Sequence, residues 1–72
     1  MLLARFKTDE RLYHIHEQPT FFGNEIDLLC VHGFIEGNRI TKKIVICKDK
    51  DDVNVQLERI TKEQLSKKYQ EY

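Results

Sequence analysis

The sequence is poor in the residues that interrupt or cross-link small domains, and it carries no excess of charge. It has one proline, three glycines, two cysteines and no tryptophan among 72 residues. Twelve basic and twelve acidic side chains give a formal net charge of zero. This balance excludes an overall positive field that would draw the chain to phosphate backbones or anionic membranes. Any surface for nucleic acid must therefore be local.

The cysteines and the short hydrophobic runs define the expected cellular setting. Cys30 and Cys47 both lie inside apolar runs. Two cysteines without a secretory leader indicate buried thiols in the reducing cytoplasm rather than a disulfide framework. The apolar segment 1–6 is too short for a signal peptide, and no run approaches the ~20 residues of a membrane span. We expect one cytoplasmic domain over residues 1–72, without a membrane segment.

Alternating apolar and polar residues predict strands before the last third of the chain. Pro19 and the Gly23-Asn24 pair indicate a chain reversal, and "EGN" at 36–38 indicates a hairpin. One expected strand is apolar on both faces, which favours a central position in the sheet. That strand is the third of the four expected ones, which cover 2–7, 11–18, 25–35 and 39–47.

The remaining segment predicts a single helix. Asp51 or Asp52 is expected to cap it, because no glycine or proline follows the cluster "KDKDD" at 48–52. Apolar residues then recur at helical spacing, with a shifted stripe that reaches the end of the chain: Val53, Leu57, Ile60, Leu65, Tyr69 and Tyr72. Strands followed by one helix favour an α+β fold with the helix on one face of an antiparallel sheet. The other face is left to water or to a partner.

Two sets of residues suggest chemistry but favour a structural role. His14 and His16 share one face of their strand, Cys30 and His32 share one face of theirs, and zinc accepts imidazole and thiolate. Without a C-x-x-C or H-x-x-x-H pair, core cysteines and half-exposed histidines are favoured. Cys30 or Cys47 beside a histidine would suit nucleophilic catalysis, but one small core leaves little room for a closed active site. We expect no metal, no cofactor and no enzymatic activity.

A basic segment is more informative. Arg39, Lys42, Lys43 and Lys48 occur within 39–48, a stretch without an acidic residue. One interpretation is an edge strand that lysines protect against pairing with another chain. The other is a phosphate-contacting edge beside the rings of His32 and Phe34, since aromatic and imidazole faces next to cations suit stacked nucleotides.

The order of several short motifs resembles the Trp-Gly-Arg (WGR) domain, a DNA-dependent regulatory module of some poly(ADP-ribose) polymerases and of small bacterial proteins. The matching segments span nearly the whole chain. At its end, Lys67 has the family's spacing from Tyr72, with Glu71 in place of a glycine. The earlier matches are Arg11-Leu12-Tyr13, the turn Phe21-Phe22-Gly23, His32-Gly33-Phe34-Ile35 in place of Trp-Gly-Arg-Ile, and the turn Glu36-Gly37.

The resemblance implies a curved antiparallel sheet of about four strands with a C-terminal helix, and a non-catalytic module that engages DNA ends and neighbouring domains. His32 and Phe34 stand where the family has tryptophan and arginine, and no phenylalanine imitates the bidentate contacts of arginine. The resemblance makes Gly33 the middle of the motif. Physically, a glycine inside a strand indicates a bulge or a close backbone approach.

The leading prediction is a WGR-like interaction module that binds nucleic acid, with DNA as the expected partner. The alternative is a protein-interaction or dimerisation module that uses the exposed sheet face, and a homodimer fits that alternative. The residues expected to contact nucleic acid are His32, Gly33, Phe34, Arg39, Lys42, Lys43 and Lys67.

Overall fold

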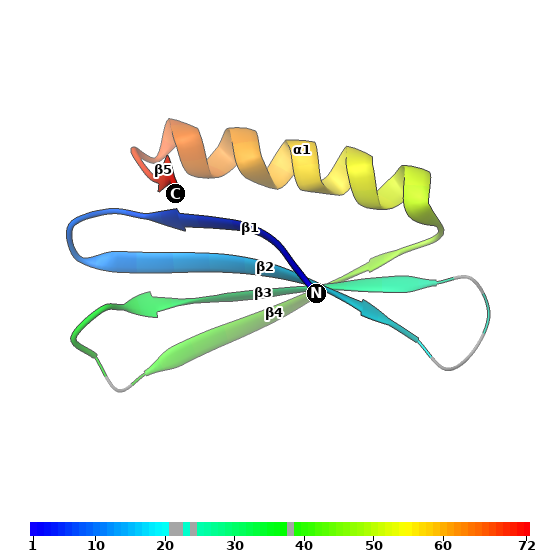
Figure 1. Cartoon of the computed structure of the whole chain (residues 1–72), viewed down its shortest axis with the longest axis horizontal. Helices are drawn as coiled ribbons and strands as arrows, with labels where there is room; N and C mark the ends of the chain where they lie inside the picture. Colours follow the sequence, from blue (N-terminus) through cyan, green and yellow to red (C-terminus); the bar gives the residue numbers. More distant parts are fainter. Residues whose placement is uncertain (21–22, 24, 38) are drawn as a thin grey trace.

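A computed structural model describes residues 1–20, 23, 25–37 and 39–72, and these residues form an antiparallel sheet with one helix packed on it (Figure 1). The sheet is open and has the strand order β4-β3-β2-β1-β5. The predicted α+β fold class is confirmed. In chain order the elements are β1 (Leu2–Lys7), β2 (Arg11–Pro19), β3 (Ile26–Phe34), β4 (Ile40–Cys47), α1 (Lys50–Ser66) and β5 (Gln70–Glu71).

The first four strands agree with the segments predicted from alternation. β3 lies between β2 and β4, so its predicted interior position is confirmed. β2 ends at Pro19, which has no backbone N–H to extend the ladder. Gly23 has a φ of +74°, the left-handed region that glycine adopts without strain. Phe21, Phe22, Asn24 and Asn38 lie outside the described residues, and with them parts of the turns predicted at 21–24 and at 36–38.

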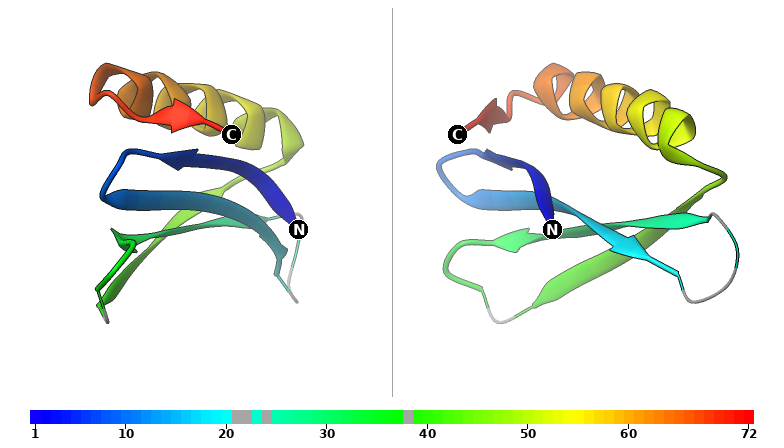
Figure 2. Two further views of the ribbon diagram at one scale, coloured as in Figure 1. Left: turned by 60° about the vertical axis from the view of Figure 1, so that its left-hand side comes forward. Right: turned by 45° about the vertical axis from the view of Figure 1, so that its right-hand side comes forward.

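The core lies between the sheet and α1, which Figure 2 shows stacked over one face of the twisted strands. The helix contributes Val53 and Ile60. Both cysteines are free and buried, as predicted, because each points from its strand toward the helix. The fully buried side chains of the sheet are Phe6, Ile15, Leu28, Cys30 and Cys47.

The predicted helix start was wrong by two or three residues. Asp49 is the N-cap, with extended backbone, and its carboxylate accepts a hydrogen bond from the Asp52 N–H at 2.9 Å. The Asp52 carboxylate in turn accepts one from the Lys48 N–H at 2.9 Å. Asp51 and Asp52 lie inside the first turn instead, where their charges face the positive end of the helix dipole.

The predicted helix end was also wrong, because the chain leaves the helix at Ser66. Lys68 adopts a φ of +70°, and the Tyr69 N–H donates to the Gln64 carbonyl at 3.1 Å. Gln64 is buried and Leu65 is half exposed, so Gln64 continues the inner stripe. The turn brings Tyr69 into the core and lets β5 pair with β1 as a fifth strand. The sequence did not predict this turn, because its left-handed residue, Lys68, is not a glycine.

The helix covers one face of the sheet, and the opposite side is called the open face below. Register and alternation assign side chains to it. On β4 the open face carries exposed Ile40, Lys42, Ile44 and Ile46. On the other strands it carries Arg5, Lys7, Leu12, His14, His16, Asp27, Leu29, Val31 and Gly33.

Candidate nucleic-acid interface

Two cross-strand pairs place rings and a cation together at one end of the helix-covered face. Tyr13 on β2 faces His32 on β3, and their rings stack with centroids 5.2 Å apart and an interplanar angle of 9°. The next pair on this face is Arg11 with Phe34. The guanidinium carbon of Arg11 lies 4.7 Å from the centroid of the Phe34 ring, a cation–π contact. Phe34 remains 54% exposed, so part of its ring is free for a ligand.

These pairs open into a hollow of about 300 Å³, called the basic hollow below. Its charged lining residues are Arg11 and Arg39, and none of its described lining residues is acidic. Arg39 stands at the entry to β4, beside the end of β3. The complete lining is Arg11, His32, Gly33, Phe34, Arg39, Thr41 and Tyr69.

Gly33 is what allows β3 and the entry of β4 to lie this close. A Cβ atom on Gly33 would stand 2.6 Å from the Arg39 carbonyl oxygen, which is a backbone atom. The close backbone approach predicted for this glycine is confirmed. No register shift interrupts the pairing of Gly33 with Leu12 and Ile40, so it is not a bulge. The missing side chain therefore sets the position of Arg39 at the rim of the basic hollow.

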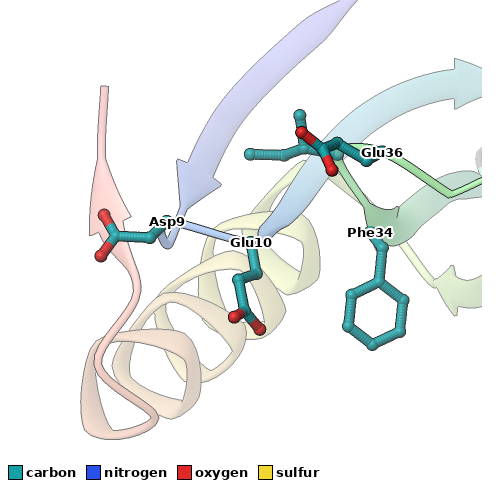
Figure 3. A pocket seen from close by; sticks show the side chains of 5 residues that line it. Asp9, Glu10, Phe34 and Glu36 are labelled. Atoms are coloured by element: carbon teal, nitrogen blue, oxygen red, sulfur yellow. The ribbon is translucent and has the colours of Figure 1, made fainter.

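An acidic hollow adjoins the same phenylalanine. Asp9, Glu10, Phe34, Ile35 and Glu36 line a space of about 320 Å³, and the Ile35 N–H donates to the Glu10 carbonyl at 2.8 Å. Figure 3 shows Glu10, just before β2, and Phe34, at the end of β3, pointing in the same direction, with Asp9 and Glu36 directed elsewhere. These carboxylates repel phosphate, so an anionic ligand must approach Phe34 from the side of Arg39 and Thr41.

The predicted lysines are not all part of this surface. Lys43 faces Cys30 across the ladder and therefore lies on the helix-covered face, two residues beyond Thr41. Lys42 faces Val31 on the open face. Lys67 is the C-cap of α1, and its ammonium lies 3.3 Å from the Glu63 carboxylate. The structure thus brings together His32, Gly33, Phe34 and Arg39, with Lys43 on the same face, and it separates Lys42 from them.

Arg11 and Tyr69 line the basic hollow but were not among the predicted site residues. Alternation along 11–18 is consistent with Arg11 on the face of Tyr13, yet it does not show that Phe34 is its cross-strand neighbour. That pairing depends on the register between β2 and β3. Tyr69 was assigned to the helix stripe, and it reaches the basic hollow only because the chain turns at Lys68.

The half-buried ring of Tyr13 forms the aromatic floor of the site. Burial raises the pKa of the Tyr13 hydroxyl far above its ordinary value, and a hydrogen bond with Cys30 raises that pKa further. Tyr13 therefore stays protonated under His32 at physiological pH. Its ring also contacts Phe6 and Tyr69 edge-on, with centroids 6.5 and 6.1 Å away. The stacked His32 ring thus rests on a fixed aromatic support.

A second group of cations and rings lies on the open face. The Tyr72 hydroxyl is 2.8 Å from Nε2 of His14, while the Arg5 guanidinium lies 4.5 Å and the Lys7 ammonium 5.0 Å from the Tyr72 ring centroid. Burial, together with the charges of His16 and Arg5, lowers the pKa of His14. His14 and His16 are thus on the face opposite Cys30 and His32, so these four residues cannot share one metal ion.

Comparisons with protein-family models, with curated proteins and with solved structures found no match to this chain. Within the described parts of the chain, no helix is both long enough and apolar enough to cross a membrane.

Proposed function

We propose that the protein is a non-catalytic, WGR-like nucleic-acid-binding module, with DNA as the expected partner. A base stacks on Phe34, and Arg11 and Arg39 contact the neighbouring phosphates. The observation that carries the proposal is the guanidinium of Arg11 at 4.7 Å from an exposed phenylalanine ring, at the rim of a hollow that Arg39 also lines. Aromatic platforms beside cations are how proteins hold single-stranded nucleic acid.

The surroundings of Phe34 limit the ligand to an unpaired or terminal base. A base inside a duplex is stacked on its neighbours and cannot lie against the ring. The acidic hollow blocks phosphates on one side, so the strand must run past Arg39 and Thr41 toward Lys43. This path agrees with the ends or nicks that the WGR resemblance implies, and here the phenylalanine supplies stacking in place of the family's arginine.

The number of cations on this path predicts the strength of the salt dependence. Arg11, Arg39 and Lys43 lie on the helix-covered face. Three phosphate contacts give a slope of log affinity against log salt of about −2 for a single strand. Between about 50 and about 200 mM salt, affinity should then fall roughly 15-fold. A chain with zero net charge has no further long-range attraction, so overall affinity is modest.

The test is a titration of fluorescent single-stranded DNA, nicked duplex DNA and intact circular duplex DNA without ends, and of single-stranded RNA, with the purified protein at both salt concentrations. We expect saturable binding to single-stranded or nicked DNA above intact duplex. Phe34→Ala should weaken binding about 5- to 160-fold, the range of one base–aromatic stack. Intact duplex bound as tightly as single strands, or no saturable binding at about 50 mM salt, would overturn the proposal.

The adjacent lysines of β4 supply a matched control. Lys43→Gln removes a cation from the proposed path, whereas Lys42→Gln removes one from the open face. Both side chains are exposed, so neither change disturbs the core. We expect Lys43→Gln to weaken binding and to reduce the salt slope by about 0.7, with Lys42→Gln close to the wild type. Equal effects of the two changes would mean that lysines on both faces of the sheet contribute to binding, which would contradict the proposed path.

A further inference from the structure

The longer free edge of the sheet is β4, and its outer backbone groups can pair with another strand. The strand order puts β4 at one edge and β5 at the other. β5 has two residues and β4 has eight. One side of β4 is paired with β3 from Ile40 to Cys47, and in the described part of the chain no strand lies on its other side. The backbone N–H and C=O groups on that side are a template for another strand.

The side chains of this edge are unusually apolar. Ile40, Ile44 and Ile46 share the open face and are 65%, 57% and 66% exposed. Leu29 and Val31 on β3 lie half buried beside this row. Single exposed aliphatic side chains are common on monomers, but a row of them along a free edge strand marks a pairing surface.

We propose that β4 pairs antiparallel with β4 of a second copy of this chain, across a two-fold axis at Ile44, so that the two sheets become one. This inference does not rest on the proposed function, because it uses the edge backbone and the open face rather than the basic hollow. A two-fold axis makes the contact self-complementary and closed, so it yields a dimer and not a filament.

The two lysines of β4 select the axis. A two-fold axis at Lys42 or at Lys43 would place identical ammonium groups directly opposite each other, which destabilises a strand pair. An axis at Val45 would place Lys42 opposite Lys48 of the second copy. An axis at Ile44 places Lys42 opposite Ile46 and Lys43 opposite Val45, with Ile44 against its own copy. Axes nearer either end of the strand leave only a few residues paired.

Charge complementarity supports the same register. Asp27 lies beside Ile46 on the open face, and no salt bridge involves it among residues 1–20, 23, 25–37 and 39–72. With the axis at Ile44, Lys42 of the second copy faces Ile46. Its methylene stem can lie along that isoleucine with the ammonium directed to Asp27, as long basic side chains do over apolar surface. Each dimer contains two such Lys42–Asp27 pairs.

Stacking of the two open faces is disfavoured by the same charges. The open face carries Arg5, Lys7 and Lys42 against Asp27, so two stacked copies would bury like charges against each other. Pairing through the edge leaves Arg5 and Lys7 in water. A single-strand contact buries little area, below the ~1,200 Å² that separates weak from standard interfaces. Half of the chains are therefore expected to be dimeric at a protein concentration between about 10 and about 1,000 µM.

Cysteine cross-linking tests the register directly. In the proposed dimer the two copies of residue 44 face each other with Cα atoms about 4.5–5.5 Å apart, which a disulfide spans. The copies of residue 46 are offset by about 13 Å along the strands and those of residue 40 by about 27 Å, beyond the ~7 Å limit. Ile40→Cys and Ile46→Cys are thus matched controls, because both positions are as exposed as Ile44 or more. The buried thiols Cys30 and Cys47 are common to all variants.

Under mild oxidation at about 500 µM protein, without nucleic acid, Ile44→Cys should form a disulfide dimer at least ten times faster than either control. Sedimentation of the unmodified chain should show a concentration-dependent dimer. Ile44→Arg should abolish that dimer, whereas Val55→Arg, at an exposed apolar position on α1, should retain it. A monomer up to about 1 mM, or faster cross-linking of Ile40→Cys or Ile46→Cys, would overturn the proposal.

Discussion

Replacing Gly33 by alanine tests whether the close approach of β3 and β4 governs this end of the domain. Two effects oppose each other. Alanine is favoured over glycine inside a strand by about 0.5–1 kcal/mol, because glycine loses more backbone entropy on folding. The new Cβ would stand 2.6 Å from the Arg39 carbonyl oxygen, whereas ordinary contacts lie at 3.4–4 Å. The backbone must therefore move by most of an ångström, and overpacking of this kind costs about 1–3 kcal/mol.

The steric term wins, and we expect Gly33→Ala to lower the free energy of unfolding by about 1–2 kcal/mol. For a domain of this size that corresponds to a fall in Tm of roughly 4–16 °C. Urea unfolding followed by circular dichroism measures the change. Gly37→Ala is the comparison, because its Cβ would meet the Phe34 Cβ at 3.1 Å and should cost less. A Gly33→Ala protein as stable as the wild type would refute the steric reasoning, since propensity alone favours alanine.

Two further predictions concern the end of the helix and the open face. Lys68→Gly should raise the free energy of unfolding by about 0.5–1 kcal/mol. Lys68 has a φ of +70°, which costs a non-glycine residue about 1–2 kcal/mol, and the larger unfolded-state entropy of glycine offsets part of that gain. A loss of stability in thermal unfolding would contradict this prediction. His14 has a folded-state pKa below its unfolded value of 6.5, so the unfolded chain binds more protons in that interval and stability falls as the pH drops below 6.5. Between about pH 7.5 and about pH 5.5 the wild-type Tm should fall more than that of His14→Gln, and equal falls would rule out this source of pH dependence.

The strands were predictable because their signal is local. Alternation in segments such as 11–18, with a proline or a glycine-containing turn at the ends, is enough to place strands to within about a residue. The same alternation correctly assigned Cys30 and His32 to one face of β3. The helix boundaries were less predictable, because several aspartates can cap the start and a lysine supplies the left-handed turn at the end.

The candidate site was predictable only in part. His32, Gly33, Phe34 and Arg39 are close in sequence, so the hairpin alone brings them together. Arg11 and Tyr69 join them from distant parts of the chain, through the β2–β3 register and the turn after α1. The separation of Lys42 from Lys43 follows from alternation, but the environment of each face does not. Only the packed structure shows that one face is occupied by α1 and the other is open.

The sequence by itself determined the fold class, the positions of the first four strands along the chain and the existence of one helix. These features follow from backbone preference and hydrophobic period, which act over a few residues. The tertiary structure alone decided three other features. It added β5, placed Arg11 over Phe34, and left β4 as a free edge with three exposed isoleucines. Each of these depends on which residues distant in the sequence become neighbours, and that is fixed by strand register and by the burial of one sheet face against the helix.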